Sequence, residues 1–316
     1  MTDRFYPGKQ WFDTDGRLIQ AHGGGVMYCN GVYYWYGEHR GYVDPPSPGE
    51  RQRCPCVGIG CYSSTDLYNW KFEGLVLSRS NDPAHDLFYR NILERPKCIQ
   101  NKKTGKFVLW MHIDSPSYGY ARAGYAIGDT PVGPFTYKTA IRPNGCMSRD
   151  MTVFRDDDGI AYIFHSSEDN KTMVVSRLNT DYTHPDGVYA RIFPQLVREA
   201  PAVFKRKGLY YCVTSYCTGW RPNEAMIARA EHPFGPWEIL GNPCISEGKE
   251  LTYGSQSTHL LPIAGMEDAI IFMADIWNPV YLTDSRYLWL PVQWRNDLPE
   301  IPMLPEWRWE TPGIFG

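Results

Sequence analysis

Three acidic residues stand at the same place in a repeated sequence pattern, and this placement predicts acid–base chemistry. Glu94, Asp150 and Glu199 each precede an apolar run, a glycine turn and a second apolar or aromatic run. His22 and Gln256 begin two further copies, and we call the place that all five residues occupy the polar position. Carboxylates brought close together cannot all ionise cheaply, so the pKa of at least one is raised. A carboxylic acid that stays protonated near neutral pH can donate its proton to a leaving group.

A polar plug is the structural alternative, with each of these side chains bonded to the backbone of a channel. A single residue at such a position is more often structural, but three carboxylates favour a site because like charges are costly to place together. Hydrolysis of a glycosidic bond uses such a set. One carboxylic acid protonates the leaving oxygen, and a second group activates water, about 6.5–9.5 Å away in enzymes that invert the anomeric centre.

The repeat itself predicts a series of β-hairpins. The turn glycine falls nine residues after the polar position in four copies and eleven residues after it in the second. Asn-Gly and Asp-Gly between apolar runs indicate tight hairpins, because the favoured turns need positive φ. Successive polar positions lie 72, 56, 49 and 57 residues apart, which leaves room for two more strands in each unit.

Five four-stranded units predict an all-β fold, a five-bladed β-propeller formed by residues 1–316 as a single domain. The outer strands repeat as well, since residues 129–135 and 231–237 share a Pro-x-Gly-Pro-aromatic pattern. Two packed β-sandwiches are the alternative arrangement. In a propeller the innermost strands line a central channel and begin on one face, so the five polar positions are expected to converge there.

Composition and charge narrow the class of partner. The net charge is −3 and there are no basic runs, which argues against nucleic acid and anionic membranes as partners. No stretch is long and apolar enough to span a bilayer, and the first residues lack the layout of a signal peptide. We expect a cytoplasmic protein as the chain stands, or a secreted or periplasmic one if a signal has been removed.

The cysteines and tryptophans each allow two interpretations. The nine cysteines cannot all be paired within one chain, and the cluster of Cys54, Cys56 and Cys61 lacks a second ligand pair, so it predicts a structural or incidental group of thiols and no metal site. The thiols weakly favour a reducing compartment.

Four tryptophans lie in or near the inner hairpins, where they could stack on the apolar faces of sugar rings or belong to the core: Trp35, Trp110, Trp220 and Trp277.

The sequence resembles glycoside hydrolase family 43, and most closely its exo-β-1,3-galactanase subgroup. The resemblance runs from about residue 17 to about residue 310. It rests on short motifs in a specific order and spacing, at residues 20–25, 33–38, 94–97, 148–151, 198–201, 215–220 and 254–258. It implies a five-bladed propeller that inverts the anomeric centre.

The resemblance also implies roles for individual residues. Glu199 matches the catalytic acid, and Asp150 matches an aspartate that orients this acid and modulates its pKa. The family at large uses an aspartate base in the first blade, but His22 stands there in this chain. Gln256 matches a residue proposed as an unusual base through its imidic acid tautomer, and Glu94 matches a residue that binds substrate and holds that tautomer.

The identity of the base stays open from the residues alone. An amide is a very weak base, so Glu94 or Glu38 must assist Gln256, and either could itself be the base. The remaining predicted sugar contacts are Glu38, Trp220, Asn223 and Thr218. His22 has two interpretations, as a sugar contact or as a wall of the pocket.

No cofactor is required for protonation and attack by water. A structural calcium ion is compatible with the resemblance, since His259 matches a histidine that family members often place near a channel water or calcium. The sequence does not identify the oxygen ligands that calcium needs.

The resulting functional hypothesis is release of galactose from the non-reducing end of β-1,3-galactan or its oligosaccharides, such as those of arabinogalactan. Within the same fold, arabinofuranosidase, galactofuranosidase or xylosidase activity is the alternative. A non-catalytic glycan-binding propeller is a third hypothesis. Lectin propellers usually repeat one binding residue in every blade, whereas the five polar positions here hold four residue types, which favours one asymmetric active site.

Overall fold

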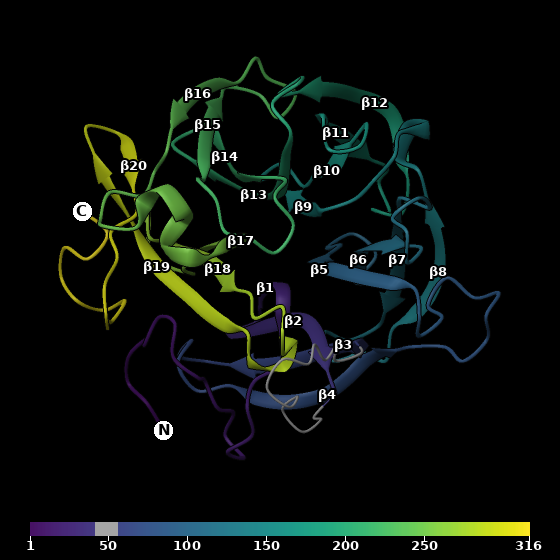
Figure 1. Ribbon diagram of the computed structural model, residues 1–316, viewed down its shortest axis with the longest axis horizontal. Helices are drawn as coiled ribbons and strands as arrows, with labels where there is room; N and C mark the ends of the chain where they lie inside the picture. The colour runs from purple at the N-terminus through teal and green to yellow at the C-terminus, as the bar shows by residue number, and fades with distance from the viewer. Residues whose placement is uncertain (42–55) are drawn as a thin grey trace.

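The computed structural model describes residues 1–41 and 56–316, and it contains five four-stranded antiparallel sheets arranged in a ring (Figure 1). The first two sheets are formed by β1 (His22–Cys29), β2 (Val32–Arg40), β3 (Cys56–Ser64), β4 (Lys71–Ser78), β5 (Ile92–Gln100), β6 (Phe107–Asp114), β7 (Arg122–Gly128) and β8 (Thr136–Ile141). The third and fourth are formed by β9 (Met151–Arg155), β10 (Ala161–Ser167), β11 (Thr172–Leu178), β12 (Pro185–Ile192), β13 (Arg198–Arg206), β14 (Leu209–Tyr216), β15 (Met226–Ala230) and β16 (Glu238–Gly241). The fifth is formed by β17 (Gln256–Pro262), β18 (Ile270–Ile276), β19 (Arg286–Arg295) and β20 (Leu298–Glu300).

Each sheet is one blade, and the first strand of each blade faces the axis of the ring. The inner strands contact one another in a closed circuit, β1 with β5, β5 with β9, β9 with β13, β13 with β17 and β17 with β1. The helical elements of residues 1–41 and 56–316 are three short 3₁₀ turns, η1 (Pro143–Gly145), η2 (Lys249–Gly254) and η3 (Leu282–Asp284). The predicted five-bladed β-propeller is confirmed, and so are its four strands per blade.

The inner hairpins form where the glycine turns predict them. Asn30 and Gly31 both have positive φ, and so do Lys207 and Gly208. Two successive positive φ angles are the geometry of the tight turn whose twist matches that of antiparallel strands. The turns therefore set the pairing of β1 with β2 and of β13 with β14.

A β-bulge follows the polar position in three of the inner strands. The pairing register shifts directly after His22 in β1, after Glu94 in β5 and after Glu199 in β13. The next residue is in the left-handed region each time: Gly23 at φ 61°, Arg95 at φ 56° and Ala200 at φ 54°. A bulge bends its strand and re-aims the neighbouring side chains. The same local distortion thus recurs at the mouth of the channel.

The core lies between neighbouring blades and is richest in aromatic residues where the fifth blade meets the first. Trp35 and Trp110 are fully buried, so both belong to the core. Phe5 and Trp307 form an isolated antiparallel bridge, with Phe5 N–H donating to Trp307 O over 2.9 Å. The segments before β1 and after β20 therefore pair beside this junction.

Two further sequence predictions concern membranes and thiols. Within residues 1–41 and 56–316, no helix has the length and hydropathy needed to cross a membrane. The eight cysteines of these ranges are free thiols. Cys56 and Cys61 lie in β3, whereas Cys54 lies outside the described residues.

Candidate active site

A cavity of about 310 Å³, the active-site cavity, opens where the inner strands begin. Four of the five residues at the polar position line it: Glu94, Asp150, Glu199 and Gln256. The remaining lining residues are Glu38, Arg40, Arg95, His112, Tyr118, Arg149, Asn170, Cys217, Gly219, Trp220 and Trp277. The convergence predicted from the repeat therefore holds for four of the five positions.

His22 is the exception, because it does not line the cavity. Its side chain is fully buried, its Nε2 lies 3.1 Å from Gln20 Oε1, and its ring stacks on Tyr287 at a centroid distance of 5.3 Å. Burial, and next the charge of Arg40, lower the pKa of His22 to about 3, so the imidazole is neutral at working pH. The prediction of a sugar contact is thus corrected: His22 belongs to the wall behind the cavity.

Glu199 has the environment of a general acid. Gln256 Nε2 donates to its Oε1 over 2.9 Å, and Asn170 Nδ2 donates to its Oε2 over 3.3 Å. Burial, and next the negative charge of Asp150, raise the pKa of Glu199 to about 7. A carboxyl group with this pKa is about half protonated at neutral pH and can deliver a proton there.

The side-chain amide of Gln256 is fixed by partners on both of its polar atoms. Its Oε1 accepts hydrogen bonds from Arg95 Nη2 and from Trp277 Nε1, the latter over 3.0 Å. Its Nε2 donates to Glu199 and, over 3.0 Å, to Ser215 Oγ. Guanidinium and indole groups are donors only, so the atom that faces them must be an accepting oxygen.

Arg95 connects three of the inner strands, although the sequence offered it only as the second residue of a motif. Its Nη2 pairs with Asp150 Oδ2 at 2.8 Å, and its Nη1 donates to the carbonyl of Ser257 over 3.0 Å. The side chain is only 6% exposed. The β-bulge after Glu94 directs the side chain of Arg95 into the ring. A sequence analysis that located this bulge could have identified Arg95 as a site residue.

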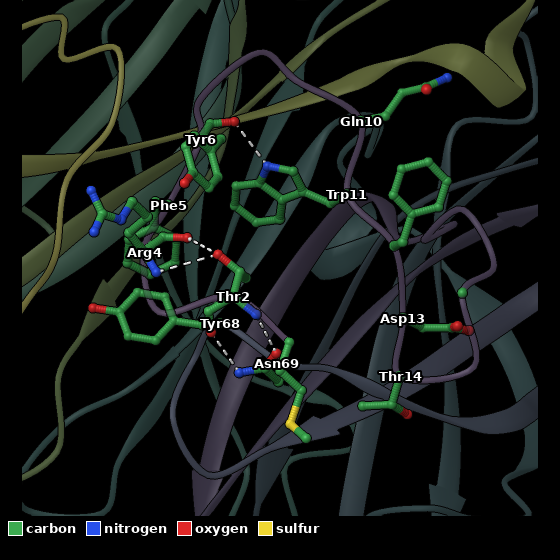
Figure 2. A pocket seen from close by; sticks show the side chains of 13 residues that line it. Thr2, Arg4, Phe5, Tyr6, Gln10, Trp11, Asp13, Thr14, Tyr68 and Asn69 are labelled. Atoms are coloured by element: carbon green, nitrogen blue, oxygen red, sulfur yellow. Dashed lines mark hydrogen bonds between the residues drawn. The ribbon is translucent and has the colours of Figure 1, made fainter.

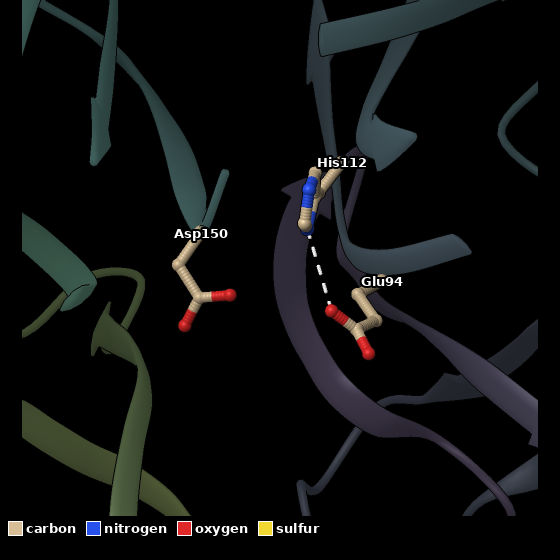
Figure 3. A group of neighbouring side chains, drawn as sticks. All are labelled: Glu94, His112 and Asp150. Carbon is tan, nitrogen blue, oxygen red and sulfur yellow. Dashed lines mark ion pairs between the residues drawn. The ribbon is translucent and has the colours of Figure 1, made fainter. Parts of the chain in front are cut away.

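Glu94 is held at both of its carboxylate oxygens. His112 Nδ1 forms an ion pair with Oε2 at 3.3 Å (Figure 3), and the Tyr118 hydroxyl donates to Oε1 over 3.1 Å. Burial alone would raise the pKa of Glu94, but the contact with His112 and the charges of His112, Arg40 and Arg95 bring it below its usual value. Glu94 is therefore an ionised carboxylate at neutral pH.

Glu38 lies deeper than Glu94 and is already paired. Its side chain is 1% exposed, its Oε2 accepts from Arg40 Nη2, and its Oε1 accepts from the backbone N–H of Arg95 over 3.3 Å. Burial raises the pKa of Glu38. A Cβ on Gly23 would lie 2.5 Å from Glu38 Oε1, so the first blade needs glycine there for Glu38 to fit.

The aromatic wall of the cavity comes from the fourth and fifth blades. Trp220 and Trp277 pack edge to face, with ring centroids 5.4 Å apart at 71°, and Trp220 is 42% exposed. Exposed aromatic rings beside carboxylates suit the mixed apolar and polar surface of a sugar. The structure thus places Trp220 and Trp277 at the cavity, unlike Trp35 and Trp110.

Thr218 and Asn223 do not line the active-site cavity. Asn223 exchanges hydrogen bonds with the backbone of Tyr216, each over 2.9 Å, and its Nδ2 donates to Thr218 Oγ1 over 2.6 Å. Asn223 lines a smaller hollow that shares Trp220 and Trp277 with the active-site cavity. Both side chains hold the loop that carries Trp220, and their contact with a sugar stays a prediction.

Several cavity residues were missed from sequence because loops and turns supply them. Asn170 ends a run in which Glu168, Asp169 and Asn170 all have positive φ, at the turn between β10 and β11. Asparagine tolerates this conformation well, so a polar run ending in Asn between two apolar strands was an available signal. Tyr118 comes from the loop after β6, for which the repeat gave no signal.

The cavity does not fit calcium, although three ligand-type side chains meet there. The ligand atoms of Glu94, His112 and Asp150 lie within 4.8 Å of one another (Figure 3). Calcium takes six to eight oxygen ligands. Here His112 supplies nitrogen and is paired with Glu94, while Asp150 is paired with Arg95.

The channel below the cavity already contains the amine of Lys97, whose pKa is lowered to about 7 by burial and next by the charge of Arg95. Lys97 is 2% exposed, and its Nζ donates to the carbonyl of Gly23 over 2.7 Å. Burial, and next the charge of Lys97, lower the pKa of His259 to about 3, so this histidine is a neutral neighbour of Lys97. Lys97 thus places a nitrogen next to the histidine that the resemblance had associated with calcium.

A larger hollow, of about 480 Å³, lies between residues 1–16 and the turn that contains Tyr68 and Asn69 (Figure 2). Its single lining carboxylate, Asp13, accepts hydrogen bonds from the backbone N–H groups of Asp15 and Arg17. No pair of carboxylates meets there, so acid–base chemistry belongs to the active-site cavity.

The fold and the cavity together define a class: a five-bladed β-propeller with a carboxylic acid of raised pKa beside further carboxylates. The family model of glycosyl hydrolases family 43 matches residues 24–297. The chain therefore belongs to glycoside hydrolase family 43, and it is a glycoside hydrolase.

Solved structures of this family match nearly the whole chain. A family 43 β-1,3-galactosidase with galactodeoxynojirimycin is 42% identical, with a TM-score of 0.88 over 96% of this chain and 100% of that one. The exo-β-1,3-galactanase of Phanerochaete chrysosporium with galactose is 33% identical, with a TM-score of 0.87 over 96% of this chain and 68% of that one. The exo-β-1,3-galactanase of Clostridium thermocellum is 36% identical, with a TM-score of 0.85 over 96% and 66%.

Matches to curated relatives are shorter. The β-D-galactofuranosidase of Aspergillus niger is 32% identical over 185 residues, 56% of this chain and 54% of that protein. The chain spans between about a third and about half of the length of the curated relatives it matches.

Proposed function

We propose that this protein is an inverting exo-acting β-1,3-galactosidase that releases galactose from the non-reducing end of β-1,3-galactan or its oligosaccharides. The observation that carries the proposal is the full-length likeness to the β-1,3-galactosidase with galactodeoxynojirimycin, which extends over 96% of this chain. The Phanerochaete enzyme has also been solved with galactose and with β-1,3-galactotriose. A neutral sugar suits a cavity lined by carboxylates, the exposed Trp220 and the half-buried Trp277.

In the proposed mechanism, Glu199 protonates the glycosidic oxygen as the bond to the leaving group breaks. Its raised pKa, near 7, keeps a useful protonated fraction at neutral pH. Burial, and next the negative charge of Asp150, raise that pKa, and the ion pair with Arg95 fixes the position of Asp150.

We assign the water-activating base to Glu94 and not to Gln256. The imidic acid tautomer would place an O–H on Oε1, where Arg95 and Trp277 both direct donors. Gln256 also contacts Glu199 at 2.9 Å, whereas an inverting acid and base stand about 6.5–9.5 Å apart. Gln256 therefore orients the acid, while ionised Glu94 takes the proton from water.

Glu38 is the less suitable base because it is already neutralised by Arg40 and is almost fully buried. Water attacks the anomeric carbon opposite the leaving oxygen, so the released galactose has inverted configuration. We propose that no step uses a metal, a proposal supported by the ion pairs that occupy the carboxylates.

The test is hydrolysis of β-1,3-galactobiose and β-1,3-galactan followed by proton NMR from the first seconds. We expect α-galactose as the first sugar, and β-galactose as the first product would refute inversion. Parallel assays with aryl galactofuranosides, arabinofuranosides and xylosides test the alternatives, of which galactofuranosidase has the Aspergillus relative in its favour. Binding of galactobiose without release of any sugar would refute an enzymatic role.

The base assignment has its own test, made with azide as an external nucleophile. Glu94→Ala should lose activity and regain it with azide, with formation of α-galactosyl azide from an activated aryl β-galactoside. Gln256→Ala is the matched control and should show no azide rescue. Rescue of Gln256→Ala alone would assign the base to the amide position instead.

A further inference from the structure

We propose that Asp114 and His112 form a buried carboxylate–imidazolium dyad that positions Glu94 and keeps it ionised. The dyad is a positioning device, since neither residue is assigned a contact with the reacting atoms. Its role in catalysis rests on the proposed function, in which Glu94 activates water. Its existence does not, because it follows from the placement of three side chains.

The placement of two carboxylates at the two ring nitrogens favours a doubly protonated imidazole. His112 Nε2 lies 3.0 Å from Asp114 Oδ2, and His112 Nδ1 lies 3.3 Å from Glu94 Oε2. A neutral histidine carries one N–H and would turn a lone pair toward one of the two carboxylates. His112 is 1% exposed and Asp114 is fully buried, so no bulk water relieves that repulsion.

The electrostatics agree with this arrangement. Burial would lower the pKa of His112, but its contacts with Asp114 and Glu94 raise it to about 9. Both nitrogens then carry protons, so His112 cannot accept the proton that Glu94 takes from water. The imidazolium acts as a fixed charge and not as a relay.

Asp114 also connects the dyad to the loop that supplies Tyr118. Its Oδ1 accepts from the backbone N–H groups of Ser115, Tyr120 and Ala121 over 2.8, 2.8 and 2.9 Å. The hydroxyl of Tyr118, in the middle of this loop, donates to the other oxygen of Glu94. The buried carboxylate of Asp114 therefore holds both groups that contact the proposed base Glu94, the His112 ring directly and Tyr118 through its loop.

Other charged and titratable groups also face the Glu94–His112 pair and contribute to its electrostatics. They are Glu38, Arg40, Arg95, Tyr118 and Asp150. Because Asp114 shares its carboxylate with His112 and with loop backbone alone, Asp114→Asn isolates the dyad from these groups. The asparagine can keep Oδ1 for the loop and turn Nδ2 toward His112 Nε2, which leaves a neutral imidazole in the same place.

The direct test is ¹⁵N NMR of the wild-type protein labelled at its eight histidines. A histidine of ordinary pKa is neutral at pH 8. Burial lowers the pKa of His22, His165 and His259, so these also remain neutral. We expect one histidine to retain both ring protons at pH 8 and to lose this signature in Asp114→Asn. Eight neutral imidazoles at pH 8 would overturn the proposal whether or not the protein is a galactosidase.

The kinetic test compares the pH dependence of kcat/KM in wild type and Asp114→Asn. Loss of the neighbouring charge should move the acidic limb upward by about 1–3 pH units, while the alkaline limb, set by Glu199, stays in place. Asp86→Asn is the matched control, because Asp86 accepts from the Tyr120 and Tyr137 hydroxyls beside the same loop but outside the cavity. An unmoved acidic limb in a folded Asp114→Asn variant, or an equal shift in Asp86→Asn, would overturn the positioning role.

Discussion

Replacement of Glu199 by glutamine should remove the proton donor while the other side chains of the cavity stay in place. With a pKa of about 7, the protonated fraction of Glu199 falls to about a tenth at pH 8 and about a hundredth at pH 9. The alkaline limb of wild-type kcat/KM should follow this fall. Glutamine cannot donate a carboxylic proton, so the limb should disappear in Glu199→Gln.

The size of the loss depends on the leaving group. A positioned general acid contributes about 10²–10⁴-fold, so Glu199→Gln should lose that much on β-1,3-galactobiose. On a dinitrophenyl β-galactoside, whose leaving oxygen needs no proton, the loss should be below about tenfold. Glu231→Gln, on the exposed surface, is the control and should leave both substrates unaffected.

The same variant should alter stability in a pH-dependent way. Because the folded-state pKa of Glu199 is raised, its contribution to stability is complete below pH 4.5 and is lost as pH rises through 7. Glu199→Gln should thus gain about 1–3 kcal/mol relative to wild type at pH 8 and little at pH 4.5. Urea unfolding at both values measures this difference. Equal losses on both substrates together with a retained alkaline limb would refute the acid assignment.

Three further predictions follow from the walls of the cavity. Gly23→Ala should lower the free energy of unfolding in urea by about 2–4 kcal/mol, because the added Cβ would meet Glu38. Gly16→Ala is the control, since Gly16 also has positive φ but faces open space, and it should lower the free energy of unfolding by about 1 kcal/mol. Trp220→Ala should raise KM about 5–30-fold with kcat nearly unchanged, as measured on β-1,3-galactobiose, and a loss confined to kcat would contradict a binding role. Dialysis against EDTA and addition of calcium in large excess over the protein should leave Tm and kcat/KM unaltered, and a rise in Tm with calcium would contradict the occupation of the channel by the Lys97 amine.

The repeat allowed the fold to be predicted almost completely, because turn glycines and strand patterns are local signals. The site was predictable where the repeat places a residue, as at Glu94, Asp150, Glu199 and Gln256. His22 is the exception because a polar position fixes where a Cα lies but not what the side chain contacts, and the ring of His22 is buried against Gln20 and Tyr287. The His112–Asp114 pair could not be predicted, since its partners come from another strand and a loop.

The motif 215–220 shows a second limit of sequence reasoning. Trp220 reaches the cavity, but Thr218, together with Asn223 just after the motif, holds its loop. A short motif does not tell which of its members faces the ligand and which supports the backbone.

The bulge that follows the polar position in three blades has a consequence for how such an enzyme can change. These three blades share the same backbone geometry at the polar position, so a reacting group can be exchanged between them without rebuilding the scaffold. In this chain the polar position of the first blade holds the buried His22, and the proposed base, Glu94, stands in the second blade. A catalytic residue can therefore move from one blade to another during evolution. Libraries that vary only the five polar positions would sample such exchanges efficiently.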